Sequence, residues 1–350
     1  SGADIVCVLG ASSDSTIKEC VASARNYGAK IQVDLISIKD AKKRARDVEK
    51  FGVDYIGIHC AIDEQMQAQE RFGQLKDIRK VVNIPIAIAG GINSETAPKA
   101  ISSGASIIIV GGAINKAGNA EQSARNIKRS ITTLKKVKTG LFKRVSEKDI
   151  EKILAKVSTA NLSDAMHRSG VLKGLSPVTR AIKMCGKAFT VRTYPGDWAK
   201  TVEAIDRAEA GQVIVIDAGG VGPAVWGELA THGAIQKGIA GVVIDGAIRD
   251  CQEIRRLKFP AFAKIISPAA GEPKGFGEIG IPINITGTKV FSGDYIVGDD
   301  DGIVVIQSKN AVEIANRAMS ILEMEVRLRK EIDEGSTLAK ITELLKWEKR

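Results

Sequence analysis

The sequence predicts an α/β protein built from two successive domains and C-terminal helices. Up to about residue 140, apolar runs of strand length alternate regularly with amphipathic segments of helical period. Beyond that point short strands surround few helices, and an apolar stripe at helical spacing follows residue 310. The length of 350 residues also suits two domains.

The N-terminal part is expected to contain five parallel strands. These strands are predicted over Asp4–Leu9, Ile31–Ile36, Asp54–His59, Ile84–Ala89 and Ser106–Val110. Helices are predicted over Ser15–Tyr27, Ala41–Phe51, Phe72–Val81, Ser94–Ser102 and Ala120–Thr133. Repeated β/α units of this kind indicate a parallel sheet.

Two glycine pairs follow the last two predicted strands. Gly90 and Gly91 follow one, and Gly111 and Gly112 follow the other. Glycine pairs at strand ends of a barrel let backbone N–H groups approach a phosphate. The four glycines are therefore candidate phosphate-binding residues, although such pairs are also common in ordinary turns.

The C-terminal part is predicted to be a layered β/β/α domain. Its expected strands cover Lys187–Arg192, Gln212–Ile216, Gly241–Ile244, Ala261–Ile266, Ile283–Ile285, Tyr295–Val297 and Gly302–Ile306. A lysine-rich segment, 134–144, marks the boundary before it. Domains are accordingly expected over residues 1–139, 140–309 and 310–350, the last consisting of packing or oligomerisation helices.

Residues 242–253 contain the most informative motif of the chain. An apolar strand there delivers Arg249, Asp250 and Glu253 at its carboxyl end. Upstream, the segment 226–229 follows a glycine-rich run and is expected to open a helix whose free N–H groups face an anion. An anion cradle beside carboxylates predicts an acidic substrate and a metal, whereas the simpler alternative is that Arg249 and Asp250 only pair with each other at a turn.

The order GG-x-GPAVWGELA followed by GVVIDGAIRDCQEI resembles the family of regulators of ribonuclease activity A and 4-hydroxy-4-methyl-2-oxoglutarate aldolases. The resemblance runs from about Val157 to Gln307, and the signature of the family falls on Gly227, Arg249, Asp250 and Glu253. It implies the swivelling β/β/α fold and a homotrimer or hexamer with active sites at subunit interfaces. It also implies a ribonuclease as an alternative partner.

The chemistry expected of this site is metal-assisted cleavage or formation of a carbon–carbon bond next to pyruvate, or decarboxylation of a 2-oxo acid. Asp250 would hold Mg²⁺ or Mn²⁺ with support from Glu253, because hard ions prefer oxygen ligands. Arg249 would contact the keto or enolate oxygen. Backbone N–H groups would grip the substrate carboxylate, from Trp226, Gly227, Glu228 and Leu229.

The segments GADIVCVLGASS, VDLIS, GVDYIGIHCAIDEQ, IPIAIAGGIN and ASIIIVGGAI resemble 3-hexulose-6-phosphate synthase, of the orotidine-monophosphate-decarboxylase superfamily. The resemblance implies the last five units of a (β/α)8 barrel, acting on formaldehyde and ribulose 5-phosphate. His59, Asp63 and Gln65 fall on a motif of that family, so His59 would be a catalytic proton donor or substrate contact. A hydrogen-bonded core histidine is the equal alternative.

The first three strands of that barrel, with the Asp-x-Lys-x-x-Asp cluster that binds metal, have no counterpart in the sequence. A partial barrel without these groups should not complete aldol chemistry. Either the chain is a fragment of a longer fusion, which we favour, or the partial barrel is a scaffold that covers its open edge by self-association.

Composition and charge narrow the class of partner. The formal net charge is +10, and its excess lies largely in a basic stretch that includes Lys128, Lys136 and Arg144. Aromatic residues for base stacking are missing there, so a solvated face is favoured over nucleic-acid binding. Five cysteines without metal-ligand spacing favour a reducing cytoplasm. No apolar run is long enough to span a bilayer, which predicts no membrane contact.

Overall fold

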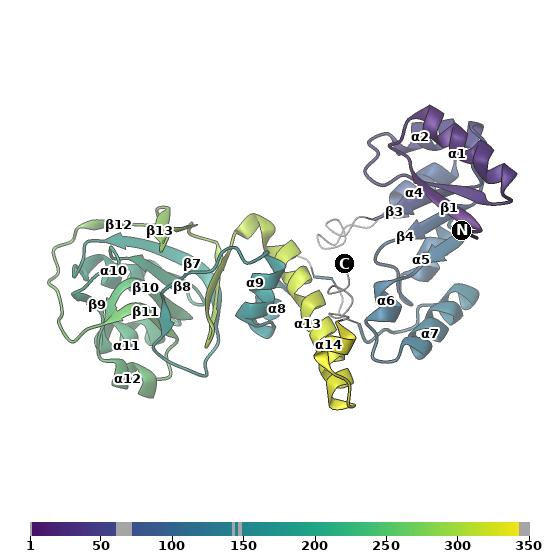
Figure 1. Cartoon of the computed structure of the whole chain (residues 1–350). Helices are drawn as coiled ribbons and strands as arrows, with labels where there is room; N and C mark the ends of the chain where they lie inside the picture. The colour runs from purple at the N-terminus through teal and green to yellow at the C-terminus, as the bar shows by residue number, and fades with distance from the viewer. Residues whose placement is uncertain (1, 61–71, 142–143, 146–148, 343–350) are drawn as a thin grey trace. The chain divides into compact units, whose positions relative to one another are not determined.

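A computed structural model describes residues 2–60, 72–141, 144–145 and 149–342. The chain divides into two compact units (Figure 1). The first comprises residues 1–144 together with 323–350, and the second comprises residues 145–322.

The first unit is built on a five-stranded parallel sheet whose strands lie in chain order. The strands are β1 (Ile5–Leu9), β2 (Lys30–Asp34), β3 (Tyr55–His59), β4 (Ile86–Ala89) and β5 (Ile107–Ile109). The helices are α1 (Asp14–Asn26), α2 (Ala41–Lys50), α4 (Phe72–Arg79), α5 (Ala97–Ser102), α6 (Gly112–Asn115) and α7 (Ala120–Thr133). The prediction of five parallel β/α units, a partial barrel-like region, is confirmed.

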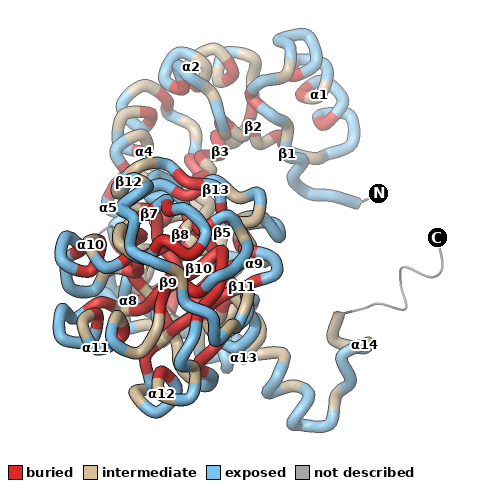
Figure 2. The backbone as a smooth tube through the Cα atoms, turned by 90° about the vertical axis from the view of Figure 1, so that its left-hand side faces the viewer, coloured by how far each residue is buried: buried red, intermediate tan, exposed pale blue. Residues whose placement is uncertain are grey.

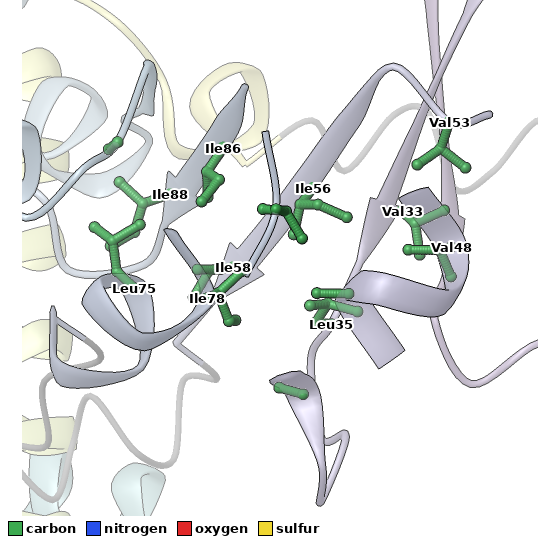
Figure 3. Packing of buried hydrophobic residues seen from close by; sticks show 14 of the residues in the cluster. Val33, Leu35, Val48, Val53, Ile56, Ile58, Leu75, Ile78, Ile86 and Ile88 are labelled. Atoms are coloured by element: carbon green, nitrogen blue, oxygen red, sulfur yellow. The ribbon is translucent and has the colours of Figure 1, made fainter. Parts of the chain in front are cut away.

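The core of this unit lies between the sheet and its helices. Ile56 and Ile88 of the sheet are buried, as are Leu75 and Ile78 of α4, and all four belong to the cluster drawn in Figure 3. Because side chains alternate across a strand, the opposite face carries the partly exposed Gln32, Asp34 and His59. Polar side chains therefore gather on the sheet face that the helices do not cover.

The second unit contains a mixed sheet of nine strands. Its main path is β16 (Gly302–Ile306), β15 (Tyr295–Asp299), β7 (Met184–Thr193), β8 (Val213–Asp217), β10 (Gly241–Ile248), β11 (Ala261–Ile266) and β6 (Ser176–Pro177). Two short strands pair beside this path, β12 (Gly277–Ile279) with β7 and β9 (Ala224–Trp226) with β10. The strands β7, β8, β10 and β11 are parallel.

Two hydrophobic clusters cover the two faces of this sheet. One joins Ile216 and Ile244 to Ala204 of α10 (Ala199–Arg207), Ala234 of α11 (Glu228–Lys237) and Ile254 of α12 (Cys251–Arg256). The other places the hairpin of β13 (Ile283–Ile285) and β14 (Thr288–Val290) against the remaining face. All eight residues of β10 are buried between them, as the red tube shows in Figure 2.

Helices α8 (Ile150–Lys156) and α9 (Thr159–Ala165) precede this sheet, and α13 (Ala311–Asp333) and α14 (Leu338–Ile341) follow it. The predicted helix after Asn310 is confirmed. Residues 311–322 of α13 belong to the second unit, and residues 323–333 belong to the first. No helix within the described ranges is long and apolar enough to cross a membrane.

The main difference from the sequence prediction concerns β10, which continues to Ile248 rather than ending at Ile244. The register with β11 shifts after Ile244, and β9 pairs with the added residues. Gly246 allows this close packing, because a Cβ atom there would lie 2.7 Å from Cβ of Ala218. The extension carries Arg249 to the sheet edge.

Candidate functional site

The predicted motif with Arg249, Asp250 and Glu253 begins where β9 and β10 end side by side. The two strands are parallel, with Ile248 opposite Trp226. The backbone N–H of Arg249 donates to the carbonyl of Trp226 over 3.0 Å. Since the carboxyl ends of parallel strands meet at one edge, residues from segments 226–229 and 249–253 come together there.

Asp250 has a left-handed backbone conformation, with φ of 56°. Aspartate tolerates this region better than most residues. Its Oδ2 atom accepts a 3.0 Å hydrogen bond from the backbone N–H of Glu228 and lies 3.5 Å from Nε of Arg249. Both the neighbouring guanidinium and the start of α11 are thus directed at this one carboxylate.

Gly227 leaves no room for a side chain, because Asp250 and Arg249 lie against it. A Cβ atom on Gly227 would lie 2.5 Å from Oδ2 of Asp250 and 3.2 Å from Cγ of Arg249. The φ angle of Gly227 is −155°, which any residue adopts, so conformation is not the reason for glycine. The close approach of Arg249 and Asp250 depends on the missing side chain.

A short hydrogen-bond chain fixes the start of α11 beneath the site. Nε1 of Trp226 donates to Oγ1 of Thr231 over 2.9 Å, and this hydroxyl donates to the carbonyl of Gly227 over 2.9 Å. Trp226 and Thr231 are both buried. These hydrogen bonds hold the start of α11 beneath Gly227, Glu228, Arg249 and Asp250, which we call the cradle. The side chains of Arg249 and Asp250 are 43% and 38% exposed.

Glu253 lies in the first turn of α12 and is paired within that helix. Its carboxylate accepts a 2.6 Å hydrogen bond from Nε of Arg256. This hydrogen bond and the positive charge of Arg256 lower the pKa of Glu253 below its usual value. His232 in turn lies 3.7 Å from Glu228 on α11. Sequence reasoning missed His232 and Arg256, although each stands one helical turn from a motif residue.

The carboxylate oxygens of Asp250 are the kind of ligand that a hard divalent ion prefers. No group of three or more His, Cys, Asp or Glu side chains that could hold a metal is found among the described residues. No described residue donates to Oδ1 of Asp250, and the Asp250 side chain as a whole is 38% exposed. Mg²⁺ commonly uses one or two carboxylates and retains waters, so Asp250 fits such a role.

The predicted residues of the first unit also lie at strand ends. His59 ends β3, and its Nδ1 atom lies 3.5 Å from Oδ2 of Asp34, which ends β2. Gly90 and Gly91 follow β4 with φ of 92° and 70°, so glycine is favoured at both positions. Gly111 and Gly112 follow β5 and are exposed.

Asp34 was not predicted as a site residue. The signal that could have found it is its position at the end of β2, the strand beside the one that ends with His59. Asp63 and Gln65 lie outside the described residues.

A cavity of about 560 Å³ lies elsewhere in the second unit. Its lining includes Tyr194, Asp197, Lys274 and Phe276, and it contains none of the predicted site residues. The predicted cradle is therefore not part of this cavity.

Two protein-family models match separate parts of the chain. Residues 1–127 match the Orotidine 5'-phosphate decarboxylase / HUMPS family. Residues 159–305 match the Aldolase/RraA model. The matched regions contain the two candidate sites.

Individual relatives agree with this division. A putative 4-hydroxy-4-methyl-2-oxoglutarate aldolase of Halalkalibacterium halodurans is 36% identical over 46% of the chain and 79% of its own length. A 3-hexulose-6-phosphate synthase of Bacillus subtilis is 41% identical over 37% of the chain, which spans 63% of that synthase. An uncharacterised Pseudomonas syringae protein of known crystal structure is 30% identical, with a TM-score of 0.51, over 58% of the chain and 98% of its own length.

Proposed function

Because the chain belongs to the Aldolase/RraA family and carries an orotidine 5'-phosphate decarboxylase/HUMPS domain in front of that part, we propose that its C-terminal domain is a carbon–carbon lyase for 2-oxo acids. The proposed reaction is aldol cleavage or decarboxylation that releases pyruvate. The proposed cofactor is Mg²⁺ or Mn²⁺.

The observation that carries the proposal is the cradle at Gly227. A residue without a side chain is needed there because Asp250 and Arg249 occupy the space of its Cβ atom. A turn that only paired Arg249 with Asp250 would place no such demand on a residue 22 positions earlier. The arrangement supports a site in which a carboxylate, a guanidinium and a helix start face one small ligand.

Arg249 is the proposed electrophilic group. Its guanidinium carries a positive charge and presents a planar set of donors. Placed beside the keto oxygen of a 2-oxo acid, it stabilises the negative charge that develops on that oxygen as the adjacent carbon–carbon bond breaks. Backbone N–H groups in the first turn of α11 are the proposed partners of the substrate carboxylate.

Asp250 is the residue proposed to hold the ion. Glu253, three residues further along the chain, would support it. The Aldolase/RraA family is generally dependent on a divalent metal. The chemistry that such an ion supplies when bound is polarisation of the keto oxygen. The hydrogen bond from Glu228 and the nearby guanidinium hold the carboxylate of Asp250 at the cradle.

Pyruvate release is the decisive test. Oxaloacetate and 4-hydroxy-4-methyl-2-oxoglutarate would be supplied with Mg²⁺ or with a chelator, to the unaltered chain and to Asp250→Asn. Asp206→Asn, an exposed change in α10 with the same loss of charge, is the matched control. Turnover that needs metal and is lost only in Asp250→Asn supports the lyase. Absence of turnover with every metal favours a non-catalytic regulator that binds a ribonuclease.

Oligomerisation through the C-terminal domain belongs to the same proposal. Leu229 follows the cradle and is 84% exposed, so a partner subunit that covered it would bury apolar surface. A homotrimer or hexamer that covers this residue would enclose the substrate. Measurement of mass in solution, with Leu229→Asp as the disrupting variant, tests it.

For the N-terminal domain we propose binding of a sugar phosphate. The support is the His59–Asp34 pair and the glycine turns at the same edge of the parallel sheet. The chain spans only part of the synthases it resembles, so condensation of formaldehyde with ribulose 5-phosphate is proposed for a chain that also supplies the Asp-x-Lys-x-x-Asp residues. Binding of ribulose 5-phosphate, lost on His59→Ala, is the test.

A further inference from the structure

The cavity of the second unit is lined by two aromatic rings that face each other. Tyr194 follows β7 and Phe276 precedes β12, and these antiparallel strands pair with Thr193 opposite Gly277. The ring centroids of Tyr194 and Phe276 lie 5.7 Å apart, with an interplanar angle of 60°. Tyr194 is 66% exposed and Phe276 is 58% exposed. The cavity of about 560 Å³ therefore offers an accessible aromatic surface against which a third ring can pack.

Hydrogen bonds fix the backbone that carries Phe276. Its N–H donates to Oδ2 of Asp197 over 2.8 Å, and its carbonyl accepts from Oγ1 of Thr193 over 3.2 Å. The N–H of Lys274 donates to Oδ1 of the same aspartate over 3.0 Å. Because this segment is already ordered in the free chain, a ligand that packs against it need not order its backbone.

The charges of the lining favour an uncharged occupant. Both carboxylate oxygens of Asp197 accept backbone hydrogen bonds, and the exposed Lys274 and Glu272 lie 4.0 Å apart and balance each other. Lys274 is the only cation among the described residues that line the cavity, and the uncharged ones are aromatic, proline, glycine or alanine. A second substrate carboxylate would meet Asp197 and Glu272, whereas a neutral ring meets apolar surface.

The cavity lies close to the cradle along the chain. Pro223 lines the cavity and Gly227 belongs to the cradle, so their Cα atoms, four residue steps apart across β9, are separated by at most about 14 Å. A second segment runs beside β9, because the N–H of Ala224 donates to the carbonyl of Ala269 over 2.8 Å, next to the lining residue Ala270. Both places therefore lie within the length of one elongated small molecule.

We propose that this cavity binds an aromatic ring of the substrate, so that the preferred substrates of the C-terminal domain are aldols of pyruvate with aryl-substituted aldehydes. This substrate class rests on the proposed lyase function of the same domain. In such a 4-hydroxy-2-oxo acid the bond between C3 and C4 breaks, and C4 leaves as the aldehyde with its oxygen. The hydroxyl proton is lost and C3 of the enolate gains a proton to give pyruvate, so no oxidant or further reactant is needed.

Turnover of two aldols that differ by one ring measures the preference. Pyruvate release with Mg²⁺ would be compared for 4-hydroxy-2-oxo-5-phenylpentanoate, the aldol of phenylacetaldehyde, and 4-hydroxy-2-oxopentanoate, the aldol of acetaldehyde. The phenyl substrate should have a kcat/KM about tenfold higher or more, the contribution of a ring that enters an aromatic pocket. Equal kcat/KM values would overturn the proposal and leave the lyase function standing. No pyruvate from either aldol or from oxaloacetate would remove the lyase function together with this substrate class.

Substitution of the two rings locates the preference in the cavity. Tyr194→Ala and Phe276→Ala should each lower the kcat/KM ratio of the phenyl substrate to the methyl substrate about threefold to tenfold. Phe291→Ala is the matched control, because it removes a ring that is 38% exposed and does not line the cavity, and the ratio should stay unchanged. A preference for the phenyl substrate that survives both cavity variants would overturn the proposal.

Binding of uncleavable analogues separates the cavity from the chemistry. The analogue 2-oxo-5-phenylpentanoate lacks the 4-hydroxyl group and cannot be cleaved, and 2-oxopentanoate is the same acid without the ring. Calorimetry should give the phenyl analogue a Kd about tenfold lower in the unaltered chain, and this difference should largely disappear in the Tyr194→Ala, Phe276→Ala double variant. Equal affinities in the unaltered chain would overturn the proposal. Failure of both analogues to bind would remove the 2-oxo acid site as well.

Discussion

The backbone N–H of Glu228 donates a 3.0 Å hydrogen bond to Oδ2 of Asp250. Through this bond Asp250, the second residue after β10, contacts the first turn of α11 and joins the two halves of the motif. The geometry depends on the parallel pairing of β9 with β10, which brings their ends level. Variants at this contact should therefore separate catalysis from folding.

Gly227→Ala should abolish activity with little loss of stability. The added methyl would lie 2.5 Å from Oδ2 of Asp250, so the carboxylate must move, whereas the extended backbone accepts alanine. We expect pyruvate release to fall by about a hundredfold or more, the effect of losing one preorganised electrostatic contact.

Gly233→Ala is the control for this change. A Cβ atom there would meet nothing nearer than 3.7 Å, and the position lies inside α11. It should keep full activity and raise the free energy of unfolding by about 0.5–1 kcal/mol through helix propensity. Equal activity in the two variants would contradict the cradle.

Asp250→Asn should remove metal binding without unfolding the chain. Asparagine has the same size and tolerates the left-handed backbone that Asp250 adopts with φ of 56°. Titration of Mn²⁺ followed by electron paramagnetic resonance should show affinity reduced by at least about tenfold, because a neutral amide oxygen is a poorer ligand than a carboxylate. Unchanged Mn²⁺ affinity would place the ion elsewhere.

Arg249→Lys and Arg249→Gln should both impair catalysis, the second more strongly. A guanidinium presents two donors in fixed geometry, whereas lysine supplies a charge without that geometry. We expect a fall in kcat of about a hundredfold for Arg249→Gln and a smaller fall for Arg249→Lys. Because the side chain is 43% exposed, thermal stability should hardly change. Arg207→Gln on α10 is the control. If steady-state kinetics gave the Arg249 variants the same kcat as this control, the proposed catalytic role of Arg249 would be wrong.

Patterns with a clear period were predictable from the sequence. Every predicted strand of the first unit lies within about two residues of an observed one, because β2 to β4 alternate with helices and are rich in isoleucine and valine. The brief strands β6, β9 and β12 were missed, since two or three residues carry no period. They form only because a neighbouring strand offers an edge.

The position of the C-terminal motif at a strand end was predictable, but the contacts between its residues were not. Arg249 and Asp250 stand out at the end of an apolar strand, whereas the contact of Asp250 with Glu228 depends on β9, which the sequence did not reveal. The pairing of Glu253 with Arg256 depends on α12 starting directly after Asp250. Tertiary contacts of this kind leave no local signal.

Asp197 gives a prediction about pH and stability. It is 2% exposed, and its carboxylate accepts hydrogen bonds from the backbone N–H groups of Ala199, Lys274 and Phe276. Burial raises its pKa, but hydrogen bonds from the backbone at Lys274, Ala199 and Phe276 outweigh burial and hold the pKa below its usual value of 3.8. The ionised carboxylate therefore ties the loop before β12 to the start of α10.

A group whose pKa is lower in the folded chain stabilises the fold at pH values above its unfolded pKa, and this contribution is lost as the pH falls through the folded value. Asp197→Asn should lower the free energy of unfolding by about 2–3 kcal/mol at pH 7, since hydrogen bonds to a charged group are replaced by weaker ones. Below pH 3.8 the difference should shrink, because Asp197 takes up a proton first in the unfolded chain and, at a still lower pH, in the folded chain. Urea unfolding at pH 7, 5, 4 and 3 measures this, with Asp206→Asn as the exposed control. A difference that stays constant down to pH 3 would show that the charge of Asp197 does not carry the effect.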